Sequence, residues 1–510
     1  MLLLGIDIGT QGTKGILINK DGKELASSYH GYEVEQPNPG WAQQWPEVWL
    51  DAVKKVIKDI VSANNVNPDD IEGIAISSLY GGAGIPVDNK IEPLAPCLIW
   101  MDRRAKEETD WVKTNLDLDN LYQITGNTVD SYYGYTKMLW IKNNWPEIWN
   151  NTNLFLPPNA YIIYKLTGEI AVDYSSAGNI GGIFDINKKT WSEEMCNKLG
   201  IPVDKQPEKL VGSDEIVGEI TEAVAEETGL KPGTPVIAGG VDAAVATLSA
   251  GAVFEGNHVA MIGTSMCWGF VTEKTNLSSK LVSMPNVIEA QDKVYSFGGA
   301  ATAGAIIRWF RDVFGQEELN TEEKLGLDAY KLLEIKTEDI PAGSEGLIVL
   351  PYFMGERSPI WDSQARGNIL GLSLYHTKGH IFKAFMEGVA YALRHNMEIM
   401  VDNDQIELDK ELLLVGGITK SDIFPQIIAD VTGFPVKIIK NDVEAPLGDA
   451  VLAGLGTGVF NSPEVLLDWI EFEETFIPDK DNKEVYDKLF EQYKELYPKL
   501  KEEMEILSDI

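Results

Sequence analysis

Residues 2–18, LLLGIDIGTQGTKGILI, decide the fold of this chain. An apolar run at 2–8 leads into a turn rich in glycine and threonine at 9–13, and a second apolar run resumes at 15–18. Two short apolar runs joined by such a turn predict a β-hairpin. The pattern returns as VAMIGTSMCWGFV at 259–271, one domain length later. This repeat suggests an internal duplication that gives each domain one hairpin.

Helical and extended patterns alternate along the rest of the chain. A helix predicted at 46–63 precedes a strand at 71–77. The second half carries a predicted helix at 381–401 before a buried strand at 412–415. This alternation favours an α/β fold with mixed sheets.

The length of the chain indicates two domains. Its 510 residues exceed the ~250–300 at which a single hydrophobic core stops growing. A helix of small residues predicted at 243–250 ends at Gly251, so we expect domains at 1–250 and 251–510. No low-complexity linker separates them, and we therefore expect the two domains to enclose a cleft.

The charge of the chain argues against several partners. With 43 basic and 78 acidic side chains, the formal net charge is -35. Such a surface repels phosphate backbones and anionic lipids, so we expect neither nucleic acid nor a membrane as a partner. The N-terminal segment lacks the basic leader of a secretion signal, and the three cysteines are far apart. These features favour a cytoplasmic protein, with a homodimer left open.

Several common catalytic motifs are missing from the sequence. It contains no G-x-x-x-x-G-K-[ST] phosphate loop and no complete G-x-G-x-x-G dinucleotide motif. His376 and His380 are four residues apart, yet their surroundings fit a solvated loop and a helix start better than a metal site. The sequence therefore gives no support to hydride transfer or to zinc-dependent hydrolysis.

The turn of the N-terminal hairpin is the first candidate site. Asp7 lies at the end of the first strand, and the turn and second strand supply Thr10, Gln11, Thr13 and Lys14. Glycines and hydroxyls in a tight turn can approach phosphate oxygens. Asp7 can hold Mg²⁺ through water, and Lys14 can neutralise phosphate charge. The alternative is an ordinary hairpin with Asp7 on the surface, and the turn alone does not decide between them.

Two glycine pairs follow predicted buried strands. Gly239-Gly240 precede Asp242, which begins a helix of small residues. Asp242 can be a helix N-cap worth ~1 kcal/mol, or its carboxylate can face a substrate hydroxyl that the glycines admit. A helix N-terminus keeps Asp242 a weak base, which suits the loose transition state of phosphoryl transfer. Gly416-Gly417 follow a strand where α/β folds leave room for a nucleotide, although by itself this pair fits a simple turn better.

These residues lie in a sequence that resembles the FGGY family of carbohydrate kinases, part of the actin-like ATPase superfamily. The most specific segment is GNILGLSLYHTKGHIFKAFME at 367–387, which fits the family's second signature at every constrained position. KMLWIKNN at 137–144 nearly meets the first signature, with Gly134 in place of the usual Pro, Ser or Thr. Further familiar segments, including LIWMDRRA, PVIAGGVD, MIGTS and PYFMGERSPIWD, extend the resemblance over nearly the whole chain.

The resemblance implies a fold, a reaction and a set of site residues. It implies two ribonuclease H-like domains around a central cleft, with the sugar bound mainly by the first and ATP mainly by the second. The implied activity transfers the γ-phosphate of ATP to a hydroxyl of a small sugar, with Mg²⁺ as the metal. By position, Asp242 matches the catalytic base and Asp7 the metal-associated aspartate. The other expected contacts are Thr10, Gln11, Thr13, Lys14, Gly263 and Thr264 for the phosphates, Gly304 and Arg308 beside the nucleotide, Gly416 and Gly417 for adenosine, and Trp100, Asp102 and Tyr132 for the sugar.

One departure from the family leaves the substrate open. Where the xylulose-kinase branch carries Gln-Met-His and the glycerol-kinase branch Gln-Arg-Glu, this chain has Tyr80-Gly81-Gly82. The glycines enlarge the expected sugar pocket or present backbone, and Tyr80 can stack on a different substrate. PYFMGERSPIWD is most similar to xylulose and gluconate kinases and GTSMC to ribulose kinases, so we favour a five-carbon ketose such as xylulose. Gluconate, ribulose and a glycerol-like polyol stay alternatives, as does a non-catalytic actin-like ATPase or sensor.

Overall fold

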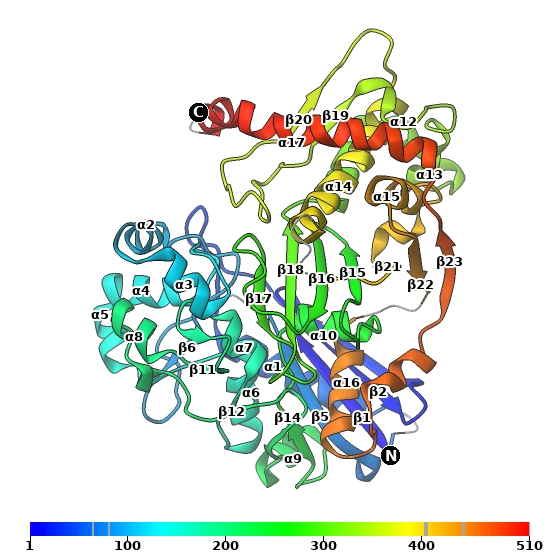
Figure 1. The fold of residues 1–510 in the computed structure, drawn as a ribbon. Coiled ribbons are helices and arrows are strands. Elements are labelled where there is room, and N and C mark those ends of the chain that lie inside the picture. The colour runs from blue at the N-terminus through cyan, green and yellow to red at the C-terminus, as the bar shows by residue number, and fades with distance from the viewer. Residues whose placement is uncertain (64–65, 80–81, 402–405, 441–443, 509–510) are drawn as a thin grey trace. The chain divides into compact units, whose positions relative to one another are not determined.

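The structure is a computed structural model that describes residues 1–63, 66–79, 82–401, 406–440 and 444–508 (Figure 1). Its contacts divide the chain into two compact units. The first comprises Met1–Glu255, Val271–Ser296 and Val443–Ile470, and the second Gly256–Phe270, Phe297–Asp442 and Glu471–Ile510. Each unit combines a β-sheet with helices, which confirms the predicted α/β class. The division at residue 250 and the cleft between the domains stay predictions.

The sheet of the first unit has six strands in the order β13-β14-β5-β1-β2-β3. β1 (Leu2–Ile8) and β2 (Gly12–Asn19) form the predicted hairpin, which pairs Asp7 with Lys14. β5 (Ile71–Ser78) runs parallel to β1 and pairs Ser77 with Asp7. The remaining strands are β3 (Glu24–Gly31), β13 (Ile216–Glu219) and β14 (Pro235–Ile237), of which β14 is parallel to β5. The carboxyl ends of β1, β5 and β14 therefore lie at one edge of the sheet.

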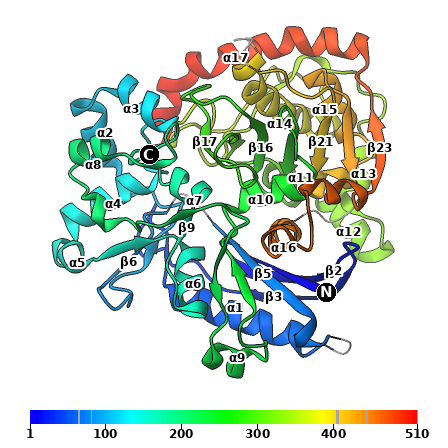
Figure 2. The same ribbon diagram turned by 60° about the horizontal axis from the view of Figure 1, so that its bottom comes forward.

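Two helices cover opposite faces of this sheet (Figure 2). α1 (Pro46–Val61) begins with a proline, which suits the first helical position. Its Val56 lies so close to β2 that Gly15 has no room for a side chain. On the other face, α16 (Ala445–Gly456) approaches β1 until a Cβ atom at Gly5 would collide with the carbonyl oxygen of Pro446. Glycines in the two hairpin strands thus set how closely both helices pack.

Shorter elements complete the first unit between residues 43 and 285. Its other helices are α2 (Lys106–Asn115), α3 (Leu118–Thr125), α4 (Gly134–Asn144), α5 (Pro146–Asn151), α6 (Pro158–Thr167), α7 (Tyr174–Asn179), α8 (Glu193–Leu199), α9 (Glu222–Thr228) and α10 (Asp242–Ser249). Its short strands are β4 (Gln43–Gln44), β6 (Ile85–Val87), β7 (Cys97–Leu98), β8 (Leu154–Leu156), β9 (Val172–Asp173), β10 (Phe184–Asp185), β11 (Thr190–Trp191), β12 (Leu210–Val211) and β17 (Val282–Pro285).

The sheet of the second unit repeats the arrangement of the first. Six strands of this sheet lie in the order β18-β16-β15-β21-β22-β23. β15 (His258–Ile262) and β16 (Met266–Thr272) form the second predicted hairpin. β21 (Leu412–Val415) and β22 (Val436–Ile439) follow β15 in parallel, and the outer strands are β18 (Val294–Ala300) and β23 (Phe472–Phe476). In both units a hairpin lies beside two parallel strands, as an internal duplication predicts.

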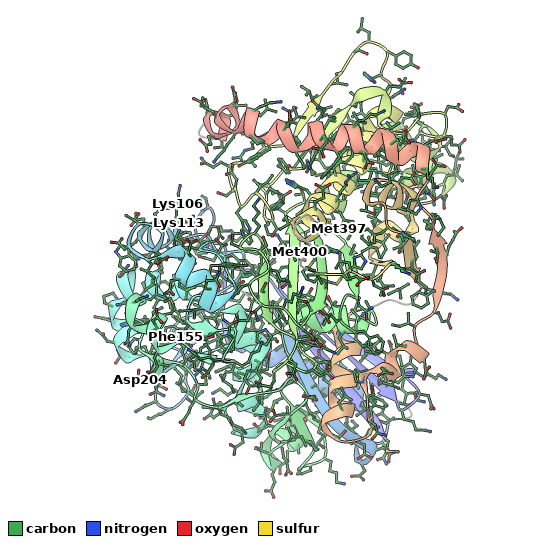
Figure 3. All side chains as sticks on the ribbon, in the orientation of Figure 1. Lys106, Lys113, Phe155, Asp204, Met397 and Met400 are labelled. Atoms are coloured by element: carbon green, nitrogen blue, oxygen red, sulfur yellow. The ribbon has the colours of Figure 1, made fainter. Side chains whose placement is uncertain are left out.

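Helices and a short hairpin surround this second sheet. They are α11 (Gly304–Phe314), α12 (Gln316–Leu325), α13 (Ala329–Ile335), α14 (Lys378–Val401), α15 (Phe424–Thr432), α17 (Lys480–Ser508), β19 (Ile348–Leu350) and β20 (Asn368–Leu370). Within the described part of the chain, no helix is both long and apolar enough to cross a bilayer. Phe155 in the first unit and Met397 and Met400 in the second are buried, whereas Lys106 and Lys113 are exposed on α2 (Figure 3).

Candidate active site

Two aspartates interact at the carboxyl edge of the first sheet. Asp7 lies near the end of β1, and Asp242 is the first residue of α10. Both side chains are half-buried. Burial, followed by the negative charge of Asp7, raises the pKa of Asp242 well above its usual value. The structure therefore brings together the residues predicted to be the catalytic base and the metal-associated aspartate.

The backbone before Asp242 explains the glycine pair of the sequence. Gly239 has a φ of 65°, and a Cβ atom there would collide with the carbonyl oxygen of Ile76 in β5. Val241 occupies the N-cap position of α10, so Asp242 is not the cap of this helix. Its Oδ1 instead accepts a hydrogen bond from the backbone N–H of Ala243 at 2.6 Å. Because Gly239 has no side chain, the backbone can lie directly against β5, and this places the Asp242 carboxylate at the edge of the sheet.

Asp7 is bound to a network that the sequence analysis missed. Burial raises the pKa of Asp7 to about 6, against the lowering effect of a hydrogen bond from Ser77, and the Glu444 carboxylate raises it further. Ser77 Oγ lies 2.9 Å from Asp7 Oδ1 and 2.5 Å from Asp449 Oδ2. Asp449, on α16, is fully buried, and this burial raises its pKa well above the usual value. The one sequence signal for Asp449 is an acidic residue inside the apolar run APLGDAVLAG at 445–454.

The turn of the first hairpin connects to the predicted sugar side. Thr10 Oγ1 accepts a hydrogen bond from Trp100 Nε1 at 3.0 Å. Gln11 is exposed, and its carbonyl oxygen accepts from the hydroxyl of Tyr29 at 3.1 Å. The structure therefore joins one predicted phosphate residue to one predicted sugar residue and leaves the Gln11 side chain at the surface.

The second strand of this hairpin carries two predicted site residues, Thr13 and Lys14, and both already contact other side chains of the protein. Thr13 is fully buried, and its hydroxyl lies 3.2 Å from that of Tyr32. Lys14 forms an ion pair with Glu444. Thr13 therefore faces the interior of the unit, and Lys14 must exchange its partner before it can meet a phosphate.

The predicted sugar residues Asp102 and Tyr132 are both buried. The Asp102 carboxylate accepts hydrogen bonds from the backbone N–H of Ala42 at 2.6 Å and from Arg104 Nε at 2.8 Å. The carbonyl oxygen of Tyr132 accepts from Lys137 Nζ at 2.6 Å. In this structure, the polar groups of Asp102 and Tyr132 named here bind other groups of the protein and stabilise the chain around the predicted sugar site.

The loop that departs from the family pattern is only partly described. Tyr80 and Gly81 lie outside the described residues. Gly82 lines a cavity of about 20 Å³ with Asn179 and Val241, the neighbour of Asp242. A cavity of this size holds about one water molecule.

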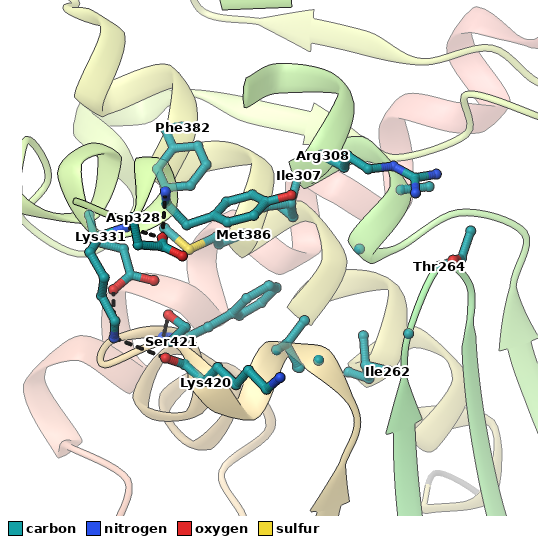
Figure 4. A pocket seen from close by; sticks show the side chains of 18 residues that line it. Ile262, Thr264, Ile307, Arg308, Asp328, Lys331, Phe382, Met386, Lys420 and Ser421 are labelled. Carbon is teal, nitrogen blue, oxygen red and sulfur yellow. Dashed lines mark hydrogen bonds and ion pairs between the residues drawn. The ribbon is translucent and has the colours of Figure 1, made fainter. Parts of the chain in front are cut away.

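The second unit contains a pocket of about 540 Å³ (Figure 4). The turn of the β15–β16 hairpin forms one end, where Gly304 N–H donates to the carbonyl oxygen of Gly263 at 2.9 Å. α11 starts at this point, where Ala305 N–H donates to the carbonyl oxygen of Thr264 at 3.1 Å, and Arg308 lies at the same end as Thr264. The positive end of a helix dipole beside an arginine favours a phosphate. The structure thus brings Gly263, Thr264, Gly304 and Arg308 together as predicted.

The other end of this pocket is suited to a flat ring. The apolar lining of the pocket is Ile262, Ile307, Phe382, Met386, Ile418 and Phe424, and its polar lining includes Asp328, Lys331, Lys420 and Ser421. Figure 4 shows Phe382, Met386 and Asp328 away from Thr264, whereas Ile262 lies beside it. Gly417 lines it as well, and Gly416, with a φ of 109°, ends β21 directly beside it. The volume lies within the range of small-ligand sites. Phe382 and Met386 were not predicted, although both belong to the signature segment at 367–387.

The residues around Asp7 fit a magnesium ion. Among the described residues, no group of three or more His, Cys, Asp or Glu side chains could hold a metal by itself. Mg²⁺ does not require such a group, because it is usually bound by one or two carboxylates together with water and substrate phosphates. Asp7 and Asp242 supply two interacting carboxylates whose charge a cation would stabilise.

Comparisons with known proteins identify the family of this chain. Residues 2–249 match the N-terminal domain of the FGGY family of carbohydrate kinases, and residues 258–457 match the C-terminal domain of the same family. The xylulose kinase of Bacillus subtilis (strain 168) is 32% identical over 503 residues, covering 98% of this chain and 97% of that protein. The gluconokinase of the same organism is 29% identical over 486 residues, covering 95% and 93%.

A solved structure extends the agreement to the fold. The ligand-bound xylulose kinase from Lactobacillus acidophilus matches with a TM-score of 0.89 at 25% identity, over 98% of both chains. The chain belongs to the FGGY family of carbohydrate kinases. It is therefore a kinase that uses ATP and takes a small sugar as its acceptor, which confirms the family and the enzyme class predicted from the sequence.

Proposed function

We propose that this protein phosphorylates a ketopentose, with xylulose as the preferred substrate, and uses ATP together with Mg²⁺. Xylulose kinase is the activity of a relative that matches this chain over nearly its full length at 32% identity. The observation that carries the catalytic part is the placement of Asp7 near the end of β1 and Asp242 at the start of α10, where the negative charge of Asp7 adds to burial in raising the pKa of Asp242. It supports one carboxylate for the sugar hydroxyl and one for the metal.

Asp242 acts as the general base in this proposal. The half-buried carboxylate orients the hydroxyl of the sugar and accepts its proton late in the transfer, because a loose transition state does not need a strong base. Asp7 holds the metal through water. When bound, Mg²⁺ supplies positive charge that neutralises phosphate oxygens and stabilises the ionised forms of both aspartates.

The nucleotide is bound by the pocket of the second unit. Adenosine lies against its apolar wall beside Gly416 and Gly417, and the phosphates extend toward Gly263, Thr264 and the start of α11. Arg308 contributes charge there. Thr10, Gln11, Thr13 and Lys14 belong to the phosphate side of the first hairpin, and Lys14 leaves Glu444 to take part.

The sugar is bound by the first unit, next to Asp242. We assign this role to Trp100, Asp102 and Tyr132 together with the loop of Tyr80, Gly81 and Gly82. The functional domains are 1–250 for the sugar and 251–510 for the nucleotide. A cytoplasmic location accords with the free cysteines, of which Cys97 and Cys196 are buried, and a homodimer is the proposed assembly.

A substrate survey tests this proposal. ADP release is measured by a coupled assay over ketopentoses, aldonates and polyols, at saturating ATP and Mg²⁺. We expect the highest kcat/KM for xylulose. Gluconate is the second candidate, because the gluconokinase relative covers almost as much of the chain at 29% identity. A higher kcat/KM for gluconate than for every ketopentose would replace the first substrate with the second.

A further inference from the structure

We propose that Ser77 and Asp449 are positioning residues, which fix the metal-binding carboxylate of Asp7 through two consecutive hydrogen bonds that start from a protonated Asp449. This inference rests on the proposed role of Asp7 and goes beyond it. Neither residue is expected to touch the sugar or the nucleotide.

The two hydrogen bonds share one hydroxyl group. Ser77 Oγ lies 2.9 Å from Asp7 Oδ1 and 2.5 Å from Asp449 Oδ2, and both distances are within hydrogen-bond range. Ser77 is the neighbour of Asp7 in the parallel pair of β1 and β5, which fixes the first bond by strand register. The second bond joins the sheet to α16.

A count of protons assigns the direction of both bonds. A serine hydroxyl donates one hydrogen and accepts through its lone pairs, whereas an ionised carboxylate can only accept. Ser77 cannot donate to two ionised carboxylates at once, so one of the two aspartates must carry a proton and donate to Ser77. The structure therefore contains one protonated carboxyl group in this chain of bonds.

Asp449 is the group that carries this proton. It is 0% exposed, and within the described part of the chain it forms no ion pair. Its second oxygen, Oδ1, is buried without a hydrogen-bond partner among the same residues. A buried charge without a partner is strongly unfavourable, while a neutral carboxyl group tolerates such a site better. Asp7 is half-buried and open to a cation, so Asp449 donates to Ser77 and Ser77 donates to Asp7.

α16 provides a rigid base for this arrangement. The helix backbone lies directly against β1 at Gly5, as described above. On its other side, the N–H of Gly448 donates to Ser249 Oγ of α10 at 2.7 Å. One helix therefore packs on both elements that carry the catalytic aspartates, and Asp449 projects from it toward Ser77. A carboxylate held in this way needs less reorganisation when it receives a metal.

Four variants test the inference. Ser77→Ala removes the shared hydroxyl, and Asp449→Ala removes the donor. Asp449→Asn keeps an N–H donor of similar shape without any charge. Ser28→Ala is the matched control, because it removes a serine–aspartate hydrogen bond of the same unit, from Ser28 Oγ of β3 to Asp59 Oδ2 at 2.9 Å, outside the candidate site.

The readouts are direct metal binding and catalysis. Binding of Mn²⁺ to each variant with ADP present is measured from the free-ion signal in electron paramagnetic resonance, and the Mg²⁺ dependence of kcat is measured at saturating ATP and sugar. Thermal unfolding checks that each variant is folded. We expect Ser77→Ala and Asp449→Ala to weaken metal binding by roughly 10-fold or more, as for other residues that orient metal ligands. Asp449→Asn and Ser28→Ala should both stay close to the parent.

Two results would overturn the inference. Asp449→Asn binding metal as weakly as Asp449→Ala would mean that Asp449 acts as an anion. Unchanged metal binding in Ser77→Ala would mean that Asp7 needs no such support, and this result stands even if Asp449→Ala fails to fold. Asp7→Asn is measured in parallel: if it binds metal normally, the proposed role of Asp7 itself is wrong, which separates that failure from a failure of the positioning residues.

Discussion

Asp242→Asn is the most informative single substitution in this protein. Oδ1 of this side chain accepts a hydrogen bond from the N–H of Ala243 at 2.6 Å, and an asparagine oxygen can accept the same bond. The change therefore preserves the start of α10 while it removes the proton acceptor. It also removes the electrostatic repulsion between positions 242 and 7.

The expected loss of turnover is large. A positioned general base contributes about 10²- to 10⁴-fold to a rate, which corresponds to roughly 3–5 kcal/mol in the activation free energy. We expect kcat for xylulose to fall within this range. The dissociation constant of ADP should be unchanged, because the nucleotide pocket lies in the second unit. The free energy of unfolding should rise, since the half-buried repulsion is gone.

The assay combines three measurements on the same preparation. They are coupled ADP release, calorimetric ADP binding and urea unfolding. Loss of a general base predicts a decrease in kcat of at least about 10²-fold. If kcat instead stays within about threefold of the parent value, Asp242 is not the catalytic base. A loss of ADP binding or of stability together with kcat would attribute the lost turnover to misfolding. Asn at this position therefore separates a chemical role from a structural one.

Three further predictions follow from contacts of the two sites. Asp7 binds its proton more tightly in the folded protein, with a pKa of about 6 against the usual 3.8, so its contribution to the free energy of unfolding falls as pH rises between these values. In urea unfolding, the stability of Asp7→Asn relative to the parent should therefore increase across this pH range and stay constant above it. Glu444→Gln frees Lys14 for phosphate, so KM for ATP should fall about twofold to threefold. The free energy of unfolding should change by less than ~1 kcal/mol, as expected for an exposed ion pair. An unchanged KM would contradict the role of Lys14. Gly304→Ala places a Cβ atom 2.5 Å from the carbonyl oxygen of Gly263. Calorimetry should therefore show ADP binding weakened about tenfold, within the ~1–3 kcal/mol that an overpacked contact costs. Normal ADP binding would refute the close approach of α11.

Local patterns were sufficient to predict the elements that carry the site. The hairpins at 2–18 and 259–271 are each defined by a turn within one short segment, and strand pairing confirms both. Asp242 was recognised because two glycines precede it, and the structure gives the reason, since Gly239 passes too close to β5 for any side chain. Such features depend on neighbours in sequence, which a pattern can reveal.

Contacts between distant segments could not be predicted in the same way. Ser77 and Asp449 are 372 residues apart, and they meet because residues 443–470 return to the first unit. No periodicity in the sequence encodes that return. The burial of Thr13 was equally inaccessible, because its hydroxyl contacts that of Tyr32, which follows β3 and lies 19 residues further along the chain. Sequence patterns thus identified candidate residues, whereas the direction in which each side chain faces depends on these distant contacts.

The charge of the protein sets a requirement that these contacts satisfy locally. A chain with a net charge of -35 must bind an anionic nucleotide, yet Lys14, which pairs with Asp7 across the hairpin, already forms an ion pair with Glu444. Burial and the negative charge of Asp7 raise the pKa values of both Asp242 and Asp449. In the proposed arrangement, a proton on Asp449 removes one negative charge, and the half-buried Asp7 and Asp242 remain to hold a cation. Such a cation stabilises the ionised forms of both aspartates and attracts the phosphates of ATP.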